Sequence, residues 1–346
     1  MRIRQNLFIA SVTWMALICI GHAVWAAGGT LTLRFEEEST SQPVICRVEF
    51  FRGAAPSGRR EKQMPIRQTV PAGIGVVVDR QVLLELPDGP YRFRAIRGPE
   101  FRIVSGSFEL EKTSLDEKTV ALPRMVHMAE EGWLSGDCCV TPSASSIPLR
   151  MASEDLHVAA TLGEQRAKPI PRRKPNEPIE HEPTWVRTDA FHHEGLVFYG
   201  VEQEGAQSVA TPSKNVFDFL VASKSAEAPP VQVGIENPFA WELPVWLASG
   251  KVDGIFVLGD WLRLDRQVLS VRDGRGSDSF SLNEPTQVGR YAERIYRHIL
   301  DAGIPLVPLA GGGDRSANTP VGYNRMYVTK STDLGTAELQ TPQVPA

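Results

Sequence analysis

The hydrophobic rhythm of the chain changes near residue 124, and this change limits what the chain can fold into. Between Thr30 and Pro123, short runs of alternating apolar and polar residues are separated by glycine, proline and charged clusters. Such runs are typical of half-buried antiparallel strands. From residue 130 onward, apolar strand-like runs alternate with segments of helical period, which indicates helices packed on a sheet. The sequence therefore predicts two domains, and 346 residues suffice for two separate cores.

The first domain is predicted to span residues 28–123 and to be an all-β sandwich of about seven strands. In the run Val44–Phe50 every second residue is apolar, and Arg47 and Glu49 are expected to face water. Its run from Leu86 to Tyr91, Leu-Pro-Asp-Gly-Pro-Tyr, resembles a turn of transthyretin-like and carboxypeptidase-regulatory-like sandwiches. The other expected strands are Leu31–Phe35, Val76–Leu86, Pro90–Ala95, Phe101–Val104, Ser107–Leu110 and Thr119–Leu122.

The second domain is predicted to span residues 130–329 as an α/β fold with a parallel sheet, either open or closed into a barrel. In both forms the active site is expected at the carboxyl ends of the strands. The expected strands are Gly132–Val140, Leu156–Leu162, Leu196–Val201, Val231–Ile235, Val252–Leu258 and Ile304–Leu309. The expected helices are Ile147–Asp155, Ser213–Lys224, Glu242–Lys251 and Gly289–Ala302, the last with a buried stripe of Tyr291, Ile295, Ile299 and Leu300.

Three polar or terminal segments are expected to lie outside the two cores. Residues 1–26 contain Arg2 and Arg4, then a mostly apolar run, then small residues before a cleavage point after Ala26. A membrane anchor is the alternative, but the apolar run is shorter than the ~20 residues of a spanning helix. We therefore predict a signal peptide and a periplasmic or extracellular protein that does not span the membrane. Gly163–Pro183 is predicted to be a surface excursion and residues 330–346 a disordered tail.

The charge balance limits the classes of partner. The chain has 37 Lys and Arg residues against 41 Asp and Glu residues, a net charge of −4, which does not favour nucleic acid. A basic stripe in the first domain is a candidate surface for a polyanionic cell-envelope glycan, with an ordinary solvated strand face as the alternative. The stripe consists of Arg92, Arg94, Arg97 and Arg102.

An odd number of cysteines remains after removal of the predicted signal peptide: Cys46, Cys138 and Cys139. A disulfide within the chain would join Cys46 to one of the adjacent pair, because adjacent cysteines pair only through a strained ring. Three buried thiols are the favoured alternative, since cysteine is a common core residue.

Four stretches of the second domain form an ordered series of motifs. They are Gly132–Asp137, Ala152–Leu156, Glu236–Leu247 and Thr319–Val328. Taken together, they resemble the PHP-type (polymerase and histidinol phosphatase) metal-dependent hydrolases, most closely their secreted CehA/McbA-like branch. The resemblance implies a distorted β/α barrel that holds divalent metal ions and hydrolyses phosphoesters or other esters. Because members of that family generally continue further, it also implies an incomplete barrel with an exposed sheet edge.

The chain departs from that family at the residues that bind metal. The family's first strand ends in Gly-Asp-x-His-x-His, which presents two imidazoles on one face of the strand. Here Cys139 and Thr141 stand at the two histidine positions. Thiolate is a good zinc ligand, whereas threonine is a poor one. The family's Asn-His pair after the strand Val252–Leu258 is replaced by Gly259, Asp260 and Trp261.

Five residues remain as candidate ligands of a divalent metal ion whose identity the sequence leaves open. Oxygen ligands suit magnesium, calcium or manganese better than a zinc-bound hydroxide. His192 and His193 are set aside, because neighbouring residues of a strand point to opposite faces. A surface carboxylate or a helix cap is the alternative for each acid. The five are Asp137, Cys139, Glu154, Glu236 and Asp260.

The loss of three imidazoles removes the family's usual means of lowering the pKa of bound water. The leading hypothesis is therefore a secreted, catalytically degenerate metallohydrolase-fold protein that acts as a binding or structural module. The alternative is an active metal-dependent phosphoesterase or ester hydrolase with altered ligands. In a third hypothesis the first domain holds a cell-envelope glycan or protein and the barrel only supports it.

Overall fold

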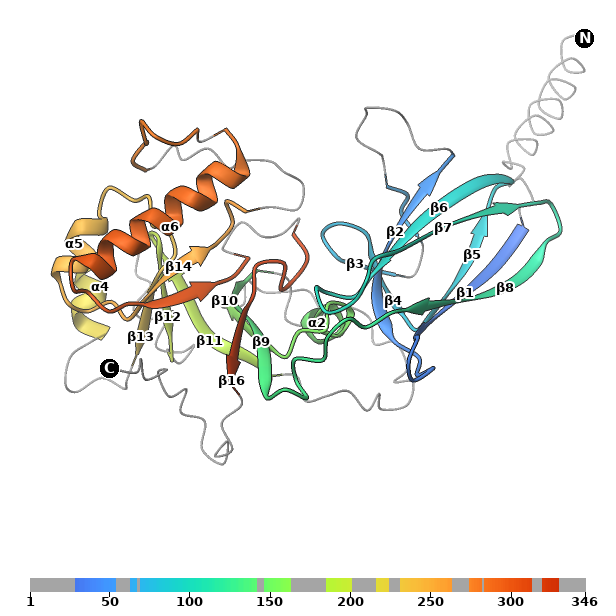
Figure 1. The fold of residues 1–346 in the computed structure, drawn as a ribbon, viewed down its shortest axis with the longest axis horizontal. Coiled ribbons are helices and arrows are strands. Elements are labelled where there is room, and N and C mark those ends of the chain that lie inside the picture. Colours follow the sequence, from blue (N-terminus) through green and yellow to red (C-terminus); the bar gives the residue numbers. More distant parts are fainter. Residues whose placement is uncertain are drawn as a thin grey trace, which may run out of the picture.

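The computed structural model describes residues 29–53, 63–66, 69–141, 146–162, 185–200, 216–223, 231–262, 274–281, 283–312 and 319–329. These residues form two β-rich regions that lie end to end (Figure 1). The predicted signal peptide, the excursion Gly163–Pro183 and the predicted tail 330–346 lie outside the described residues.

The N-terminal region consists of two sheets around one apolar core. In the first sheet, β1 (Gly29–Glu37) pairs antiparallel with β5 (Gln81–Leu86) and parallel with β8 (Leu115–Leu122). The second sheet is antiparallel, in the order β3 (Val70–Pro71), β4 (Val76–Asp79), β2 (Ile45–Arg52), β6 (Gly89–Ile96) and β7 (Val104–Leu110). The core contains the inward-facing residues of both sheets, among them Leu31, Leu33, Phe35, Cys46, Val48, Phe50, Tyr91 and Phe93.

Three details of this region differ from the prediction. Arg47 and Glu49 are buried instead of facing water, because they pair with each other and with Glu154 and Arg94. The expected strand Val76–Leu86 is split at Arg80, whose φ of 64° turns the chain from the second sheet into the first. A positive φ is uncommon for residues other than glycine, so the pattern of apolar residues does not reveal this break. The expected strand Phe101–Val104 is also wrong, because Phe101 forms only an isolated bridge with Arg124 and β7 begins at Val104.

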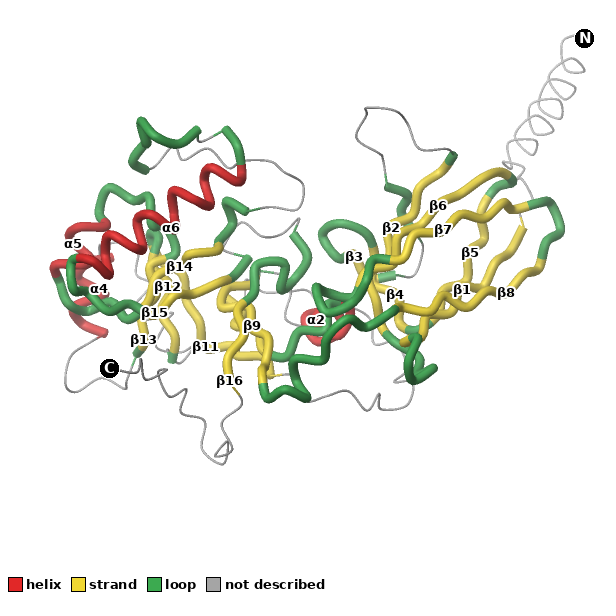
Figure 2. Tube along the Cα trace, in the orientation of Figure 1, coloured by secondary structure: helices red, strands yellow, loops and turns green. Residues whose placement is uncertain are grey.

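The C-terminal region contains one sheet of eight strands in the order β15-β14-β13-β12-β11-β10-β9-β16. Its helices α4 (Val216–Ser223), α5 (Leu243–Ala248) and α6 (Pro285–Asp301) lie on the side away from the N-terminal region, whereas α2 (Ile147–Ser153) lies between the two regions (Figure 2). The strands are β9 (Trp133–Val140), β10 (Val158–Leu162), β11 (Trp185–His193), β12 (Leu196–Tyr199), β13 (Gln232–Ile235), β14 (Gly254–Leu258), β15 (Val307–Ala310) and β16 (Met326–Thr329).

The sheet is mixed, so the prediction of a parallel sheet is wrong in part. Two parallel sets, β9-β10-β11 and β13-β14-β15, are joined by the antiparallel strand β12. The turn between β11 and β12 consists of Glu194 and Gly195, both with positive φ, as in a type I′ hairpin turn. Neither β11 nor β16 was predicted.

The eight strands form a nearly closed, barrel-like sheet. β16 pairs antiparallel with the first half of β9, from Trp133 to Gly136. The chain after β15 approaches the second half of β9 so closely that a Cβ atom on Gly311 would lie 2.8 Å from the Cys139 nitrogen. In the described residues the sheet ends at β15 and β16, each of which has one hydrogen-bonded neighbour strand. The incomplete barrel with an exposed edge therefore stays a prediction.

The helices cover the outer face of this sheet. Leu220 of α4, Trp246 of α5 and Ile299 of α6 are buried against Phe198 and Ile255 of the sheet. The predicted stripe of α6 is wrong at Leu300, which is 42% exposed, while Val288 and Ala292 are buried instead. Among the helices that the structure describes, none has the length and apolar content needed to cross a bilayer.

Candidate functional site

Four of the five candidate ligands lie where a barrel gathers its functional residues. Asp137 and Cys139 are in the second half of β9, Glu236 follows β13 directly, and Asp260 follows β14. These are the carboxyl ends of strands in the two parallel sets. We call this end of the sheet the barrel mouth. Glu154 instead follows α2, on the side that faces the N-terminal region.

Asp137 is held by main-chain amides. Its side chain is buried, and its Oδ1 accepts hydrogen bonds from the N–H groups of Cys139 (3.1 Å) and Gly312 (3.0 Å). Its Oδ2 accepts a third from Gly322 at 2.8 Å. Burial raises the pKa of Asp137 to about 6, although the three amides oppose this shift. One carboxylate thus joins β9 to the loop after β15 and to the loop before β16.

Glu236 connects two further groups of the barrel mouth. His192 Nε2 on β11 lies 2.6 Å from Glu236 Oε2, and Cys139 Sγ lies 3.9 Å from Glu236 Oε1. Glu236 and Cys139 are buried, whereas the His192 side chain is 23% exposed. Sequence reasoning set His192 aside because His193 is its neighbour. The sequence pattern does not reveal β11, which contains both histidines. Because neighbouring residues of a strand point to opposite faces, one of the two histidines must face the inside of the sheet.

Two further titratable side chains, those of Tyr199 and Cys138, lie near the barrel mouth. The Tyr199 hydroxyl donates to the Cys138 carbonyl at 2.8 Å, and burial raises the pKa of Tyr199 well above its usual value. Burial also raises the pKa of Cys138 to about 12, and its Sγ lies 3.4 Å from the Met326 sulfur. A thiol that stays protonated is a poor nucleophile, so Cys138 does not fit a catalytic role.

The candidate ligands do not form one cage. Within the described ranges, no three or more His, Cys, Asp or Glu side chains are grouped in a way that could hold a metal ion. Of the five candidates, Cys139 and Glu236 are within reach of each other, Asp137 is bound by amides, and Asp260 is half-buried at the end of β14.

Glu154 belongs to the interface between the two regions. Its side chain is buried and accepts a hydrogen bond from Arg47 Nε on β2, while Arg47 Nη1 donates to Glu49 at 2.9 Å. The Glu154 carbonyl accepts from Arg325 Nη2 at 2.9 Å, and a Cβ atom on Gly98 would lie 2.2 Å from the same oxygen. Glu154 therefore joins the N-terminal region to the barrel by side chain and main chain.

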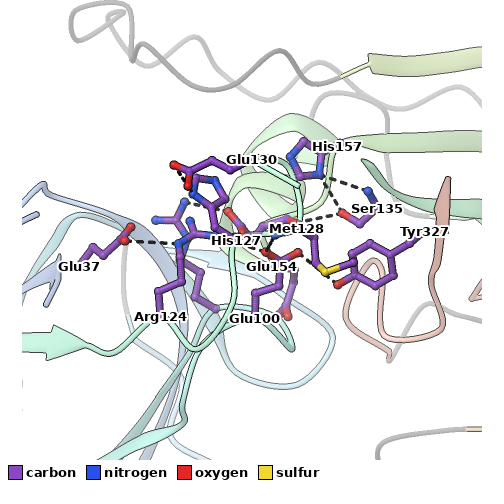
Figure 3. A network of polar contacts seen from close by, with 12 residues as sticks. Glu37, Glu100, Arg124, His127, Met128, Glu130, Ser135, Glu154, His157 and Tyr327 are labelled. Carbon is purple, nitrogen blue, oxygen red and sulfur yellow. Dashed lines mark hydrogen bonds and ion pairs between the residues drawn. The ribbon is translucent and has the colours of Figure 1, made fainter. Parts of the chain in front are cut away.

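A larger polar network surrounds this contact (Figure 3). Arg124 lies 3.0 Å from Asp155, 3.4 Å from Glu100 and 3.3 Å from Glu37, and the Tyr327 hydroxyl donates to Glu100. Burial by itself would raise the pKa of Asp155, but Arg97 and Arg124 hold that pKa below its usual value. The ion pairs thus compensate charges that the interface buries.

Three arginines of the predicted basic stripe form hydrogen bonds or ion pairs with other residues of the chain. Arg94 pairs with Glu49 at 2.7 Å, Arg97 pairs with Asp155 at 3.0 Å, and Arg92 donates to the Gly53 carbonyl. The cysteines form no disulfide in the described part of the chain, where Cys46 lies in the N-terminal core and Cys139 in a core of the barrel.

Comparison with known proteins identifies no family for this chain. No family model matches the chain, and no curated protein matches it. Among solved structures it is similar to one described as the Bacillus anthracis TIE protein, with a TM-score of 0.21 and 10% sequence identity. The match covers 34% of this chain and 20% of that protein, so this chain spans a small part of its length. A similarity of this size supports no statement about fold or function.

Proposed function

We propose that this chain is an exported protein with a PHP-like metallohydrolase fold that has lost catalysis and serves as a binding or structural module. In this proposal, residues 28–123 are a transthyretin-like or carboxypeptidase-regulatory-like sandwich, and residues 130–329 are a degenerate PHP-like barrel. The partner is a cell-envelope glycan or protein, and the location is periplasmic or extracellular.

The observation that carries this proposal is the hydrogen bonding of Asp137. Both of its oxygens accept main-chain N–H groups, from Cys139 and Gly312 on one and from Gly322 on the other. An ionised carboxylate offers about four acceptor positions, so three amides use most of its capacity. A metal ion there would have to displace bonds that connect β9 with two loops. Asp137 is thus suited to closing the sheet.

Glu154 gives independent support. In the arrangement suggested by sequence it is a metal ligand, but its carboxylate pairs with Arg47 of the N-terminal region. An arginine and a metal ion compete for the same oxygen lone pairs. Two of the acids expected in a metal cage therefore serve the architecture of the protein.

One observation favours the alternative, an active hydrolase with altered ligands. Glu236 lies next to both an imidazole and a thiol, those of His192 and Cys139. These are ligand types that zinc accepts. In this alternative the three side chains rearrange around an ion, and Asp137 and Asp260 complete its coordination.

The test uses full-length protein purified in chelator-free buffer, analysed for bound metal and assayed with p-nitrophenyl phosphate and p-nitrophenyl acetate. We expect less than about a tenth of an equivalent of any transition metal or alkaline earth, because a built site normally retains its ion. We also expect the same background hydrolysis from wild type and from Glu236→Gln. Stoichiometric metal together with activity that Glu236→Gln abolishes would establish the alternative.

A further inference from the structure

Residues of α5 and α6 line a groove on the helical side of the C-terminal region. The two helices lie next to each other in the fold (Figure 1). Its volume is about 340 Å³, at the lower end of the range for pockets that bind small molecules. Its walls are mostly aliphatic, with Leu243 and Leu247 on α5 and Ile295 and Ile299 on α6. No side chain of the barrel mouth lines it, so this surface is separate from the candidate site above.

The polar side chains that line the groove are hydrogen-bond donors. They are Arg275, His298 and Tyr291, and no carboxylate is among its lining residues in the described part of the chain. The Tyr291 hydroxyl donates to the Gly276 carbonyl at 3.0 Å. A guanidinium and an imidazole at an apolar groove favour an anion over a cation or a neutral polar group.

Arg275 is fixed before any ligand binds. Its main-chain N–H donates to the Phe239 carbonyl at 2.7 Å, and its Nη2 donates to the Trp241 carbonyl at 3.0 Å. Its guanidinium also lies 5.9 Å from the centre of the Trp241 ring. One Nη2 bond uses one of the five N–H groups of a guanidinium. A donor group positioned in this way loses little conformational entropy when it binds an anion.

We propose that this groove binds a small carboxylic acid with an apolar body, such as a medium-chain fatty acid or a similar branched acid. The carboxylate contacts Arg275 and His298, and the apolar body lies against Leu247, Ile295 and Ile299. A bond between a guanidinium and a carboxylate is charge-assisted and supplies orientation as well as affinity. This inference does not depend on the function proposed for the barrel mouth.

The test is isothermal titration calorimetry of the full-length protein with sodium octanoate, and with octylammonium as the ligand of reversed charge. We expect octanoate to bind with a Kd of about 1 mM or tighter, and octylammonium to bind at least about tenfold more weakly. Arg275→Gln is expected to weaken octanoate binding about tenfold, and His298→Gln to weaken it by a smaller factor.

The matched control is Arg297→Gln, which removes the same charge from α6. Arg297 is exposed, pairs with Glu293 at 2.6 Å, and does not line the groove. We expect wild-type affinity for octanoate from this variant. Circular dichroism confirms that each variant is folded before titration. Three results would overturn the proposal: no binding of octanoate up to about 10 mM, equal affinity for both ligands, or equal losses from Arg275→Gln and Arg297→Gln.

Discussion

The barrel mouth and the interface between the two regions both bury acidic side chains, but they compensate the charge differently. At the interface, Glu154 and Asp155 pair with arginines, and the pKa of Asp155 is held below its usual value. In the mouth, Asp137 contacts main-chain amides, and burial raises its pKa to about 6. Full countercharges thus stabilise the ionised form in one place, while partial charges only partly offset desolvation in the other.

The acids of the interface and those of the barrel mouth also differ in which parts of the chain they connect. Each interface carboxylate has a positive partner in the other region or in the connecting segment, so the network fixes how the regions pack. The acids of the mouth hold loops and neighbouring strands together. Both roles are architectural, which agrees with the proposal that the barrel has lost catalysis.

The largest expected effect comes from breaking the interface pair of Arg47. Arg47→Met leaves the buried Glu154 carboxylate without its guanidinium partner, while Glu49 keeps its ion pair with Arg94. Breaking a buried pair in this way typically costs about 3–5 kcal/mol of unfolding free energy. Urea denaturation of the full chain measures this loss of unfolding free energy. The control is Arg34→Gln, which breaks an exposed pair with Glu117 and should cost less than about 1 kcal/mol. Equal losses in the two variants would mean that the interface pair adds nothing beyond a surface contact.

Asp155→Asn is expected to cause a smaller loss of unfolding free energy, and the size of this loss should depend on pH. Asp155 has a positive φ of 53°, a conformation that asparagine also tolerates, so the variant removes charge without straining the backbone. Near neutral pH we expect a loss of about 2–3 kcal/mol, because Arg97 and Arg124 lose their common partner. The folded pKa is below the unfolded value, so this contribution is present above about pH 4 and disappears as pH falls through the folded pKa.

Thermal unfolding of the wild type and of Asp155→Asn between pH 3 and pH 7 measures that dependence. This pH range includes the pKa of an unperturbed aspartate, ~3.9. The difference between the two proteins should shrink on the acidic side. A difference that stays constant over this range would show that Asp155 acts through hydrogen bonds alone.

Asp137→Asn should show the opposite dependence on pH. The difference in unfolding free energy between the wild type and this variant should change by about 1–3 kcal/mol between about pH 4 and about pH 6. The folded pKa of Asp137, about 6, is above that of the unfolded chain, so the folded protein takes up the proton more readily. The stability of the wild type relative to Asp137→Asn should therefore be greatest below about pH 4 and fall as pH rises to about 6. The same thermal unfolding series measures it. A relative stability that rises over this window would contradict the account of the barrel mouth.

Local sequence patterns predicted much of the fold because the forces behind them are local. Alternating apolar residues locate β2 and β6, and the apolar runs locate β9, β13 and β14 close to their observed positions. The pattern fails at Arg80, where a single backbone angle divides one apolar run between two sheets. It also fails at β16, whose four residues acquire strand structure by pairing with β9, far away in sequence.

The candidate site was harder to predict because its contacts connect distant segments. Arg47 and Glu154 are 107 residues apart, and Gly322 and Asp137 are 185 apart. The sequence shows that an acid stands at the end of a strand, but whether an arginine, an amide or a metal ion meets it depends on tertiary packing. His192 is a further case, since its bond to Glu236 requires the unpredicted strand β11.

The most direct test of the lost metal site is a crystal structure of the full chain soaked with manganese chloride, with anomalous diffraction data. The account predicts no anomalous peak between Asp137, Cys139, His192 and Glu236, and hydrogen bonds from Gly312 and Gly322 still on the Asp137 carboxylate. A strong peak among these side chains, with the Asp137 oxygens turned away from the amides and toward the ion, would contradict it.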